Sequence, residues 1–242
     1  MIRNLRITFT LLFVATTFLI STNAKAQKVT VNGVIYDLTN YDGNNKAILY
    51  SHDNDQIKDT VIIPKYIEKD GVSYVVSDSN YPVLRGAFMK VLIWEADCDI
   101  REWYCRKCTN LTTVIIKGQV DQIENEAFWN CFNLKKIVFN NGLSYIGTSA
   151  FRYCYALEEV TLPESVSDLG PYAFEDCHSL KKVNIKNKKL AERNLGMYFD
   201  KTPFIEAKST QTKPNNAKRK PNQAVTNDPR FKVNKKSGTV VY

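Results

Sequence analysis

The sequence contains only two histidines, His52 and His178, among its 242 residues. Neither has a serine, cysteine or carboxylate at a spacing that would orient a catalytic triad. The sequence also lacks a phosphate-binding loop and a cluster with metal-ligand spacing. Adjacent acidic residues such as Glu158-Glu159 would need a cleft to act as a glycosidase pair. These absences predict a protein that is not an enzyme and that needs no cofactor or metal.

Long apolar runs are also lacking after residue 20. The one early run, Ile7 to Ile20, follows two arginines and precedes Ala24-Lys25-Ala26, a pattern typical of a secretory signal peptide. Its roughly 14 residues are few for a membrane span, so an anchor is the weaker alternative. No cysteine stands at the cleavage site, which disfavours a lipoprotein. We expect residues 1–26 to be removed and the mature protein to be secreted or displayed on the cell surface, without a transmembrane segment.

Outside the C-terminal region the sequence has no net positive charge. From Lys186 to the end there are 14 basic and 4 acidic residues, a net +10, whereas the whole chain carries +8. The stretch from Lys208 to Lys236 is almost free of apolar residues, so residues 208–242 are expected to form a disordered basic tail. The cluster Lys218-Arg219-Lys220 could contact polyanions. Without interleaved aromatic residues, a solvated linker is favoured, and no specific nucleic-acid partner is expected.

Four cysteines recur at a constant interval of 23 residues, and each is followed three residues later by a leucine: Cys108, Cys131, Cys154 and Cys177. The copy from Ile146 to Val166 also contains Ala150-Phe151, Val160 and Leu162, and its neighbours keep the same offsets. Upstream, Ile100 to Ile116 is a divergent copy, and Val83 to Ile93 is a shortened one whose Ala87-Phe88 we align with the Ala-Phe pair. A unit this short shares its core with its neighbours, so the pattern predicts a solenoid.

The unit Ile-Gly-x-x-Ala-Phe-x-x-Cys-x-x-Leu-x-x-Val-x-Leu-Pro-x-x-Val resembles the BspA-like leucine-rich repeats of bacterial surface proteins. The resemblance covers about residues 83–186 and implies an α/β repeat fold. In such a leucine-rich-repeat solenoid of about four to five repeats, a short parallel strand faces a tight helical turn. Residues 27–82 alternate β-rich runs with turn signals and are expected to form an N-terminal β-hairpin cap module. Residues 187–207 are expected to form a C-terminal cap.

The cysteine column leaves several interpretations open. Six cysteines in an exported chain would ordinarily indicate disulfides. Side chains stacked in one column of parallel strands rarely reach disulfide geometry, so we favour buried free thiols. The Cys105-Arg-Lys-Cys108 motif also matches a redox or metal pair, but no second pair completes a zinc site. Cys98 lies outside the column and could pair with Cys105 or remain free.

The outward residues of the repeat strands form the candidate ligand-binding surface. They are Thr113, Ile115, Lys136, Val138, Glu159, Thr161, Lys182 and Asn184. A face with mixed charge and small apolar spots suits a protein or glycan ligand, although it could equally be a solvated surface. By resemblance, a monomeric binding module would adhere to host extracellular matrix, other cells or glycans. The alternative is a structural or polysaccharide-binding accessory protein of the cell envelope.

Overall fold

The computed structural model describes residues 27–41, 43–206, 232–233 and 240–241. The expected signal peptide and most of the expected basic tail lie outside the described residues. Within the tail, strands β15 (Lys232–Val233) and β16 (Val240–Val241) pair antiparallel. No helix of the described residues is both long and apolar enough to cross a membrane.

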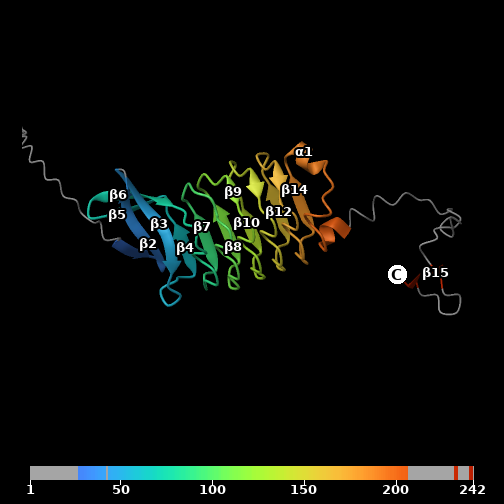
Figure 1. Ribbon diagram of the computed structural model, residues 1–242, viewed down its shortest axis with the longest axis horizontal. Helices are drawn as coiled ribbons and strands as arrows, with labels where there is room; N and C mark the ends of the chain where they lie inside the picture. Colours follow the sequence, from blue (N-terminus) through green and yellow to red (C-terminus); the bar gives the residue numbers. More distant parts are fainter. Residues whose placement is uncertain (1–26, 42, 207–231, 234–239, 242) are drawn as a thin grey trace, which may run out of the picture.

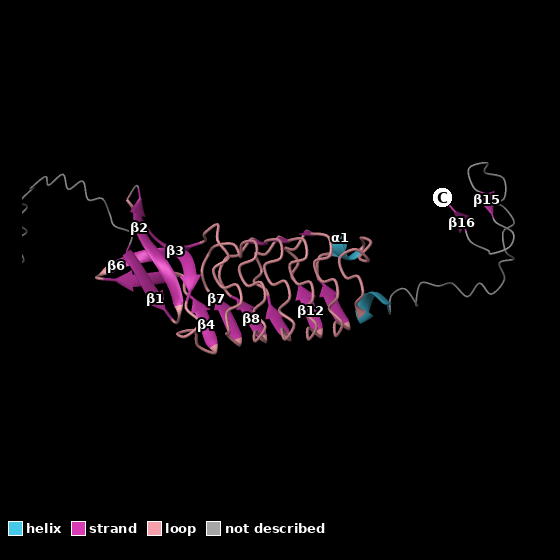
Figure 2. Ribbon diagram, turned by 60° about the horizontal axis from the view of Figure 1, so that its bottom comes forward, coloured by secondary structure: helices cyan, strands magenta, loops and turns pink. Residues whose placement is uncertain are grey.

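The central part of the chain is an elongated stack of short parallel strands (Figures 1 and 2). One row consists of β4 (Thr60–Ile63), β7 (Val91–Trp94), β8 (Thr113–Ile116), β10 (Lys136–Val138), β12 (Glu159–Leu162) and β14 (Lys182–Ile185). A second row consists of β9 (Gln122–Ile123), β11 (Tyr145–Ile146) and β13 (Asp168–Leu169). The first row begins at β4, within the range expected for the cap module.

The N-terminal module is a five-stranded sheet with the strand order β1-β2-β3-β6-β5. Its strands are β1 (Gln27–Val31), β2 (Val34–Tyr41), β3 (Asn44–His52), β5 (Tyr66–Lys69) and β6 (Val72–Ser77). The turns Asn32-Gly33 and Asp70-Gly71 each have two residues with positive φ, between 52° and 81°. Two-residue turns of this kind match the twist of antiparallel strands, which explains the hairpins β1-β2 and β5-β6.

The core of the stack is built from columns of identical or similar side chains. Phe128, Phe151, Phe174 and Phe199 are fully buried, and successive rings stack with centroids 5.1 Å apart. This spacing is close to the ~4.8 Å between hydrogen-bonded strands. The repeat spacing of the backbone therefore also sets the contact distance of the aromatic core.

The segments opposite the strands are turns rather than the expected helical turn. Residues Glu126 and Asn130 of one repeat have φ of 52° and 61°, and the equivalent residues of other repeats also have positive φ. Between them, Trp129 N–H donates to Glu126 and Cys131 N–H to Phe128, each an i→i+3 bond. A left-handed residue at both ends stops any helix from growing. The leucine-rich-repeat layout is confirmed, but the repeats are built of strands and turns rather than α/β units.

All six cysteines are free thiols. The column thiols are fully buried, and each donates to a main-chain carbonyl one repeat upstream, for example Cys131 Sγ to Cys105 O at 3.0 Å and Cys177 Sγ to Phe151 O at 3.2 Å. Burial raises the pKa of the Cys154 and Cys177 thiols well above the usual range. The Cys154 and Cys177 thiols are therefore neutral, and the hydrogen bonds of the column connect adjacent turns. Cys98 is half-buried, and burial raises its pKa to about 12.

The first repeat has a different register from the one we aligned. Phe88 is 57% exposed and so does not occupy the phenylalanine column. Instead Leu84 is fully buried, and its N–H donates a hydrogen bond to Tyr104 O. The N–H of Cys105, in the phenylalanine column of the next repeat, donates in the same way to Ala127 O. The shortened copy thus places Leu84 in the phenylalanine column and Ala87 in the cysteine column, because its turn keeps the spacing of Phe128 to Cys131 and the copy is one residue shorter between Ala87 and Leu92 of β7.

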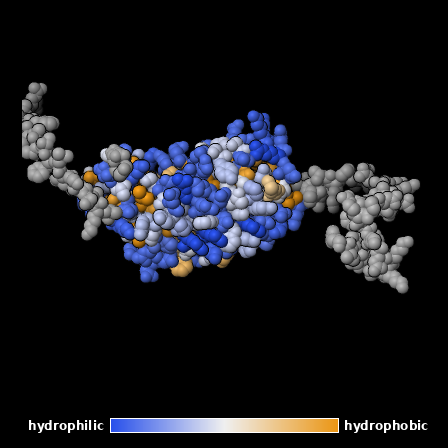
Figure 3. Space-filling view, in the orientation of Figure 1, coloured by the Kyte–Doolittle hydropathy of each residue, from blue (hydrophilic) through white to orange (hydrophobic). Residues whose placement is uncertain are grey.

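The C-terminal end of the stack is covered by a short helix, α1 (Lys188–Ala191), and by residues 203–206, which are also helical. Asn187 caps α1 by accepting a hydrogen bond from Leu190 N–H at 3.1 Å. Leu190 is fully buried and Phe204 packs against the core, so both parts of this segment contribute to it. In Figure 3 the visible surface is mostly hydrophilic, with scattered hydrophobic groups.

Candidate functional site

The predicted ligand-binding residues lie on the strands of the first row. We call the outward side of β4, β7, β8, β10, β12 and β14 the strand face. Its strands alternate between buried and solvent-accessible residues, as in β10, where exposed Lys136 and Val138 flank buried Ile137. Lys136 lies opposite Thr113 of β8, and Glu159 lies opposite Lys182 of β14. The residues of these strands therefore face inward or outward as the alternation of the sequence predicts.

The strand row is interrupted once. β10 is the last strand of a four-stranded sheet, and β12 begins a separate two-stranded sheet with β14. At the flanking junctions a main-chain bond links the residues that precede the strands, Lys135 N to Thr112 O at 2.9 Å and Lys181 N to Glu158 O at 3.1 Å. Among the described residues no equivalent bond joins Glu158 to Lys135. The strand face is thus divided between β10 and β12.

We attribute this interruption to Phe139, which directly follows β10. Equivalent residues are Ile116 and Leu162, both buried. The Phe139 ring is only half-buried and contacts Phe151 of the next repeat edge-on, at 6.0 Å between centroids. Trp94, in the same column, instead donates its indole N–H to Cys98 O at 3.1 Å. The Phe139 ring thus occupies the space in which β10 and β12 would otherwise approach each other.

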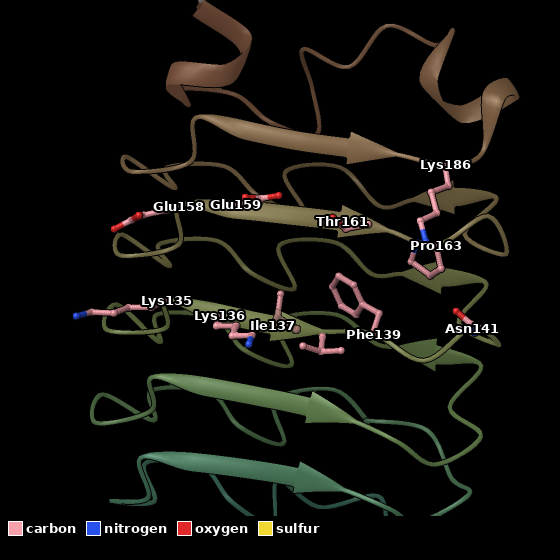
Figure 4. A pocket seen from close by; sticks show the side chains of 11 residues that line it. Lys135, Lys136, Ile137, Phe139, Asn141, Glu158, Glu159, Thr161, Pro163 and Lys186 are labelled. Atoms are coloured by element: carbon pink, nitrogen blue, oxygen red, sulfur yellow. The ribbon is translucent and has the colours of Figure 1, made fainter.

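A cavity of about 540 Å³ lies over this interruption, and we call it the hollow. Figure 4 shows its lining, which comes from β10, β12, the residues before and after both strands, and the residue that follows β14. The lining residues are Lys135, Lys136, Ile137, Val138, Phe139, Asn141, Glu158, Glu159, Thr161, Pro163 and Lys186. The middle of the hollow is apolar, whereas the charged residues lie toward its ends.

The hollow unites half of the predicted residues, Lys136, Val138, Glu159 and Thr161. The other four, Thr113, Ile115, Lys182 and Asn184, lie on the neighbouring strands β8 and β14 and do not line it. Sequence reasoning missed Phe139, which is the residue that opens the hollow. The only signal was a phenylalanine in a column that otherwise holds Ile116, Leu162 and Ile185 in the later repeats.

Ion pairs neutralise four lysines on or beside the strands of the strand face. Lys90 pairs with Asp59 at 2.8 Å, Lys117 with Glu95 at 3.0 Å and Lys182 with Glu159 at 2.6 Å. Lys65 pairs with Asp97, whose carboxylate also accepts from Gln119 N–H; these bonds lower the Asp97 pKa.

The lysines of the hollow are different. No carboxylate of the described residues lies within ion-pair distance of Lys135, Lys136 or Lys186. Glu158 is likewise without an ion pair in this part of the chain, and Glu159 is already paired outside the hollow. Three lysines therefore face a single uncompensated carboxylate.

The outward side of the turns, which we call the turn face, is instead internally paired. Arg106 binds Glu126 at 3.1 Å and lies over the Trp129 ring at 4.3 Å. Arg152 binds Glu175 at 2.6 Å and lies over Tyr153 at 4.7 Å. Cations that stack on aromatic rings and also bind carboxylates have few donors left for a ligand.

Both histidines have structural contacts. Nδ1 of His52 lies 2.6 Å from Val83 O; because a carbonyl can only accept, this nitrogen carries a proton. His178 is exposed, stacks on Tyr155 with ring centroids 5.0 Å apart and lies 3.5 Å from Asp176. Neither residue lines the hollow. Groups of histidine, cysteine and carboxylate residues with metal-binding geometry are absent from the described residues.

The repeats match a known sequence family. Six copies of the BspA type leucine rich repeat region are found over residues 99–202. These residues belong to the BspA-type leucine-rich repeat family. None of the curated proteins matches the chain.

Solved structures with a similar fold come from several bacteria. A leucine rich cell surface protein of Faecalibacterium prausnitzii is 23% identical, with a TM-score of 0.54 over 66% of this chain. This chain spans only 42% of that protein. A leucine-rich repeat protein of Bacteroides capillosus is 24% identical over 66% of this chain and 98% of its own, with a TM-score of 0.42. The T. pallidum Leucine Rich Repeat protein is 19% identical over 76% of this chain and 95% of its own, with a TM-score of 0.45.

Proposed function

We propose that this protein is an exported, surface-displayed binding module that attaches to a partner protein through its strand face. The observation that carries the proposal is the hollow between β10 and β12, where an apolar centre is bordered by lysines without ion pairs. An apolar centre with a charged rim is the usual organisation of a protein-binding patch. The BspA-type repeats and the likeness to a bacterial cell surface protein support this proposal.

Adhesion, rather than catalysis, is the role that this arrangement supports. The hollow contains lysines and glutamates but no histidine, cysteine or serine that could act as a nucleophile with its base. The stacked phenylalanines fix the positions of the strands, so the outward residues form a pre-ordered surface. We propose that a monomer presents this surface outside the cell.

The test is a binding screen of the full mature protein against surface and matrix proteins and against glycans. The best ligand is then titrated against three forms: the mature protein, a form ending at Ala207, and the double variant Lys136→Glu with Glu159→Lys. We expect the truncated form to keep its affinity and the double variant to lose it, because the charges of the hollow are reversed. Retained affinity in the double variant, with loss in the truncated form, would assign binding to the basic tail instead.

A further inference from the structure

Three lysines without an ion pair among the described residues line the hollow. Lys135 and Lys136 stand at one end of the hollow, and Lys186 reaches it at the other end, beside Pro163 (Figure 4). The other strand-face lysines described above each form an ion pair with a carboxylate. The distance is 2.6–3.0 Å for Lys90, Lys117 and Lys182, and shorter for Lys65. Unpaired cations at the border of an interface attract partners of opposite charge and exclude partners of like charge.

Between the lysines, the hollow is apolar. Ile137, Phe139 and Pro163 lie in its middle part (Figure 4), and Val138 also lines it. Val138 is 40% exposed. Phe139 is half-buried, although its equivalents Ile116 and Leu162 in the neighbouring repeats are buried. An apolar side chain from a partner would remove this area from water, at about 25 cal/mol per Å². Aliphatic walls suit an apolar amino-acid side chain better than the hydroxyl groups of a sugar.

The spacing of the lysines specifies how the ligand would be arranged. Lys136 is the first residue of β10. Lys186 directly follows β14. Because Leu162 lies opposite Ile185, the next residues, Pro163 and Lys186, are at the same level along their strands. Pro163 in turn is the counterpart of Asn140 at the repeat interval, four residues after Lys136. In an extended peptide, residues two positions apart point to the same side, at about 3.3 Å per residue. Acidic residues two before and two after an apolar residue would therefore reach both ends of the hollow.

We infer that the hollow recognises an extended acidic peptide segment of a partner protein, with one apolar side chain inserted between β10 and β12 and carboxylates two residues away on either side. This inference rests on the proposed function and adds the chemistry of the partner. The carboxylate on one side binds Lys135 or Lys136, and the carboxylate on the other side binds Lys186. The interruption of the strand row is then the binding site, and Phe139 is the residue that forms it.

The experiment measures binding of labelled peptides to the full mature protein by fluorescence anisotropy. The probe has a central phenylalanine with glutamates two positions before and after it, in a serine background. Matched peptides carry lysines in place of the glutamates, or serine in place of the phenylalanine. We expect the acidic probe to bind at least tenfold more tightly than either matched peptide. Its affinity should fall as the salt concentration rises.

Protein variants assign this binding to the hollow. Lys136→Gln with Lys186→Gln should weaken the probe about tenfold, since exposed charge pairs each contribute roughly two- to fivefold. Phe139→Leu, which restores the type of residue found in neighbouring repeats, should close the hollow and weaken binding without removing a charge. The control Lys90→Gln with Lys117→Gln removes two lysines of the same face that have ion pairs. This control should bind normally.

The outcomes separate this inference from the proposed function. Equal binding of the acidic and lysine peptides, or full binding by the Lys136→Gln/Lys186→Gln variant, overturns the inference. If a partner protein from the screen still needs Lys136 and Glu159, the proposed function stands although the inference has failed. A heparin fragment serves as the polyanionic-sugar probe. Hollow-dependent binding of this fragment, with no binding of the acidic peptide, would also overturn the inference.

Discussion

The turn face and the strand face of the solenoid differ in how completely their main-chain and charged groups are bonded. On the turn face, main-chain bonds continue through every repeat, as from Phe128 to Ala150 and from Phe151 to Ala173, each at 2.8 Å. The strand face has one junction without such bonds, at the hollow. Arg106 and Arg152 of the turn face are paired, whereas the lysines of the hollow are not. The turn face therefore supplies stability, and the strand face retains the unsatisfied groups that a ligand can use.

The largest expected effect concerns the thiols inside the turn face, whose alkylation should differ between the native and the denatured protein. The column thiols are fully buried, and burial raises the pKa of Cys131, Cys154 and Cys177 well above the usual range, so these three thiols are neutral at pH 8. Alkylation of the native protein should therefore require unfolding, which for a domain of this kind costs about 5–15 kcal/mol. Peptide mass mapping should show label on all column cysteines only after denaturation without reductant. A linked pair among them would contradict free thiols.

Removing a ring from the phenylalanine stack tests the stability of the turn side. Phe151 contacts Phe128 on one side and Phe174 on the other, both at 5.1 Å. Phe151→Ala should lower the free energy of unfolding by about 3–5 kcal/mol, as is usual for a buried phenylalanine. Val138→Ala on the strand face is the matched control and should have a small effect, because Val138 is 40% exposed. Urea denaturation of both variants measures the difference; similar midpoints would mean that the core alignment is wrong.

Removing one charge from each face sharpens the comparison further. Arg152→Met leaves the buried carboxylate of Glu175 with Lys201 at 3.1 Å as its remaining cation. We expect a loss of about 1–3 kcal/mol, the usual cost of leaving a buried polar group without its partner. Lys136→Met, which breaks no ion pair, should change stability by at most about 0.5 kcal/mol. Thermal denaturation of both variants tests the contrast, and equal losses would contradict it.

Much of this architecture could be predicted from the sequence, because a repeat shows each structural position several times. The column of Cys131, Cys154 and Cys177 fixed the period, and alternation on each strand identified the outward residues. The shortened first repeat had no such redundancy, and there the pattern misplaced Phe88. The turns also differ from the expected helical form, because left-handed residues such as Tyr153, with φ of 63°, have no consistent sequence signal.

The hollow could not be predicted for a different reason. It depends on whether a single ring fits between two strands, and that is a matter of packing rather than of pattern. Phe139 and Trp94 occupy the same column, yet only the first coincides with an interrupted strand row. The indole of Trp94 is held by its bond to Cys98 O, whereas Phe139 extends toward Phe151. Local sequence does not encode which of these arrangements a large aromatic residue adopts.

The interrupted strand row also has a mechanical consequence. If the protein links a cell to a partner, as proposed, it carries tension, and β10 and β12 are not joined by strand pairing, whereas the turns and the β9-β11-β13 row of the same repeats are bonded. Under load this junction should open first on the strand side, with the β9-β11-β13 row acting as its hinge. A ligand in the hollow touches both β10 and β12 and so would close the seam that force tends to open. The same junction would then determine both the affinity of the protein for its ligand and the force at which the repeats begin to separate.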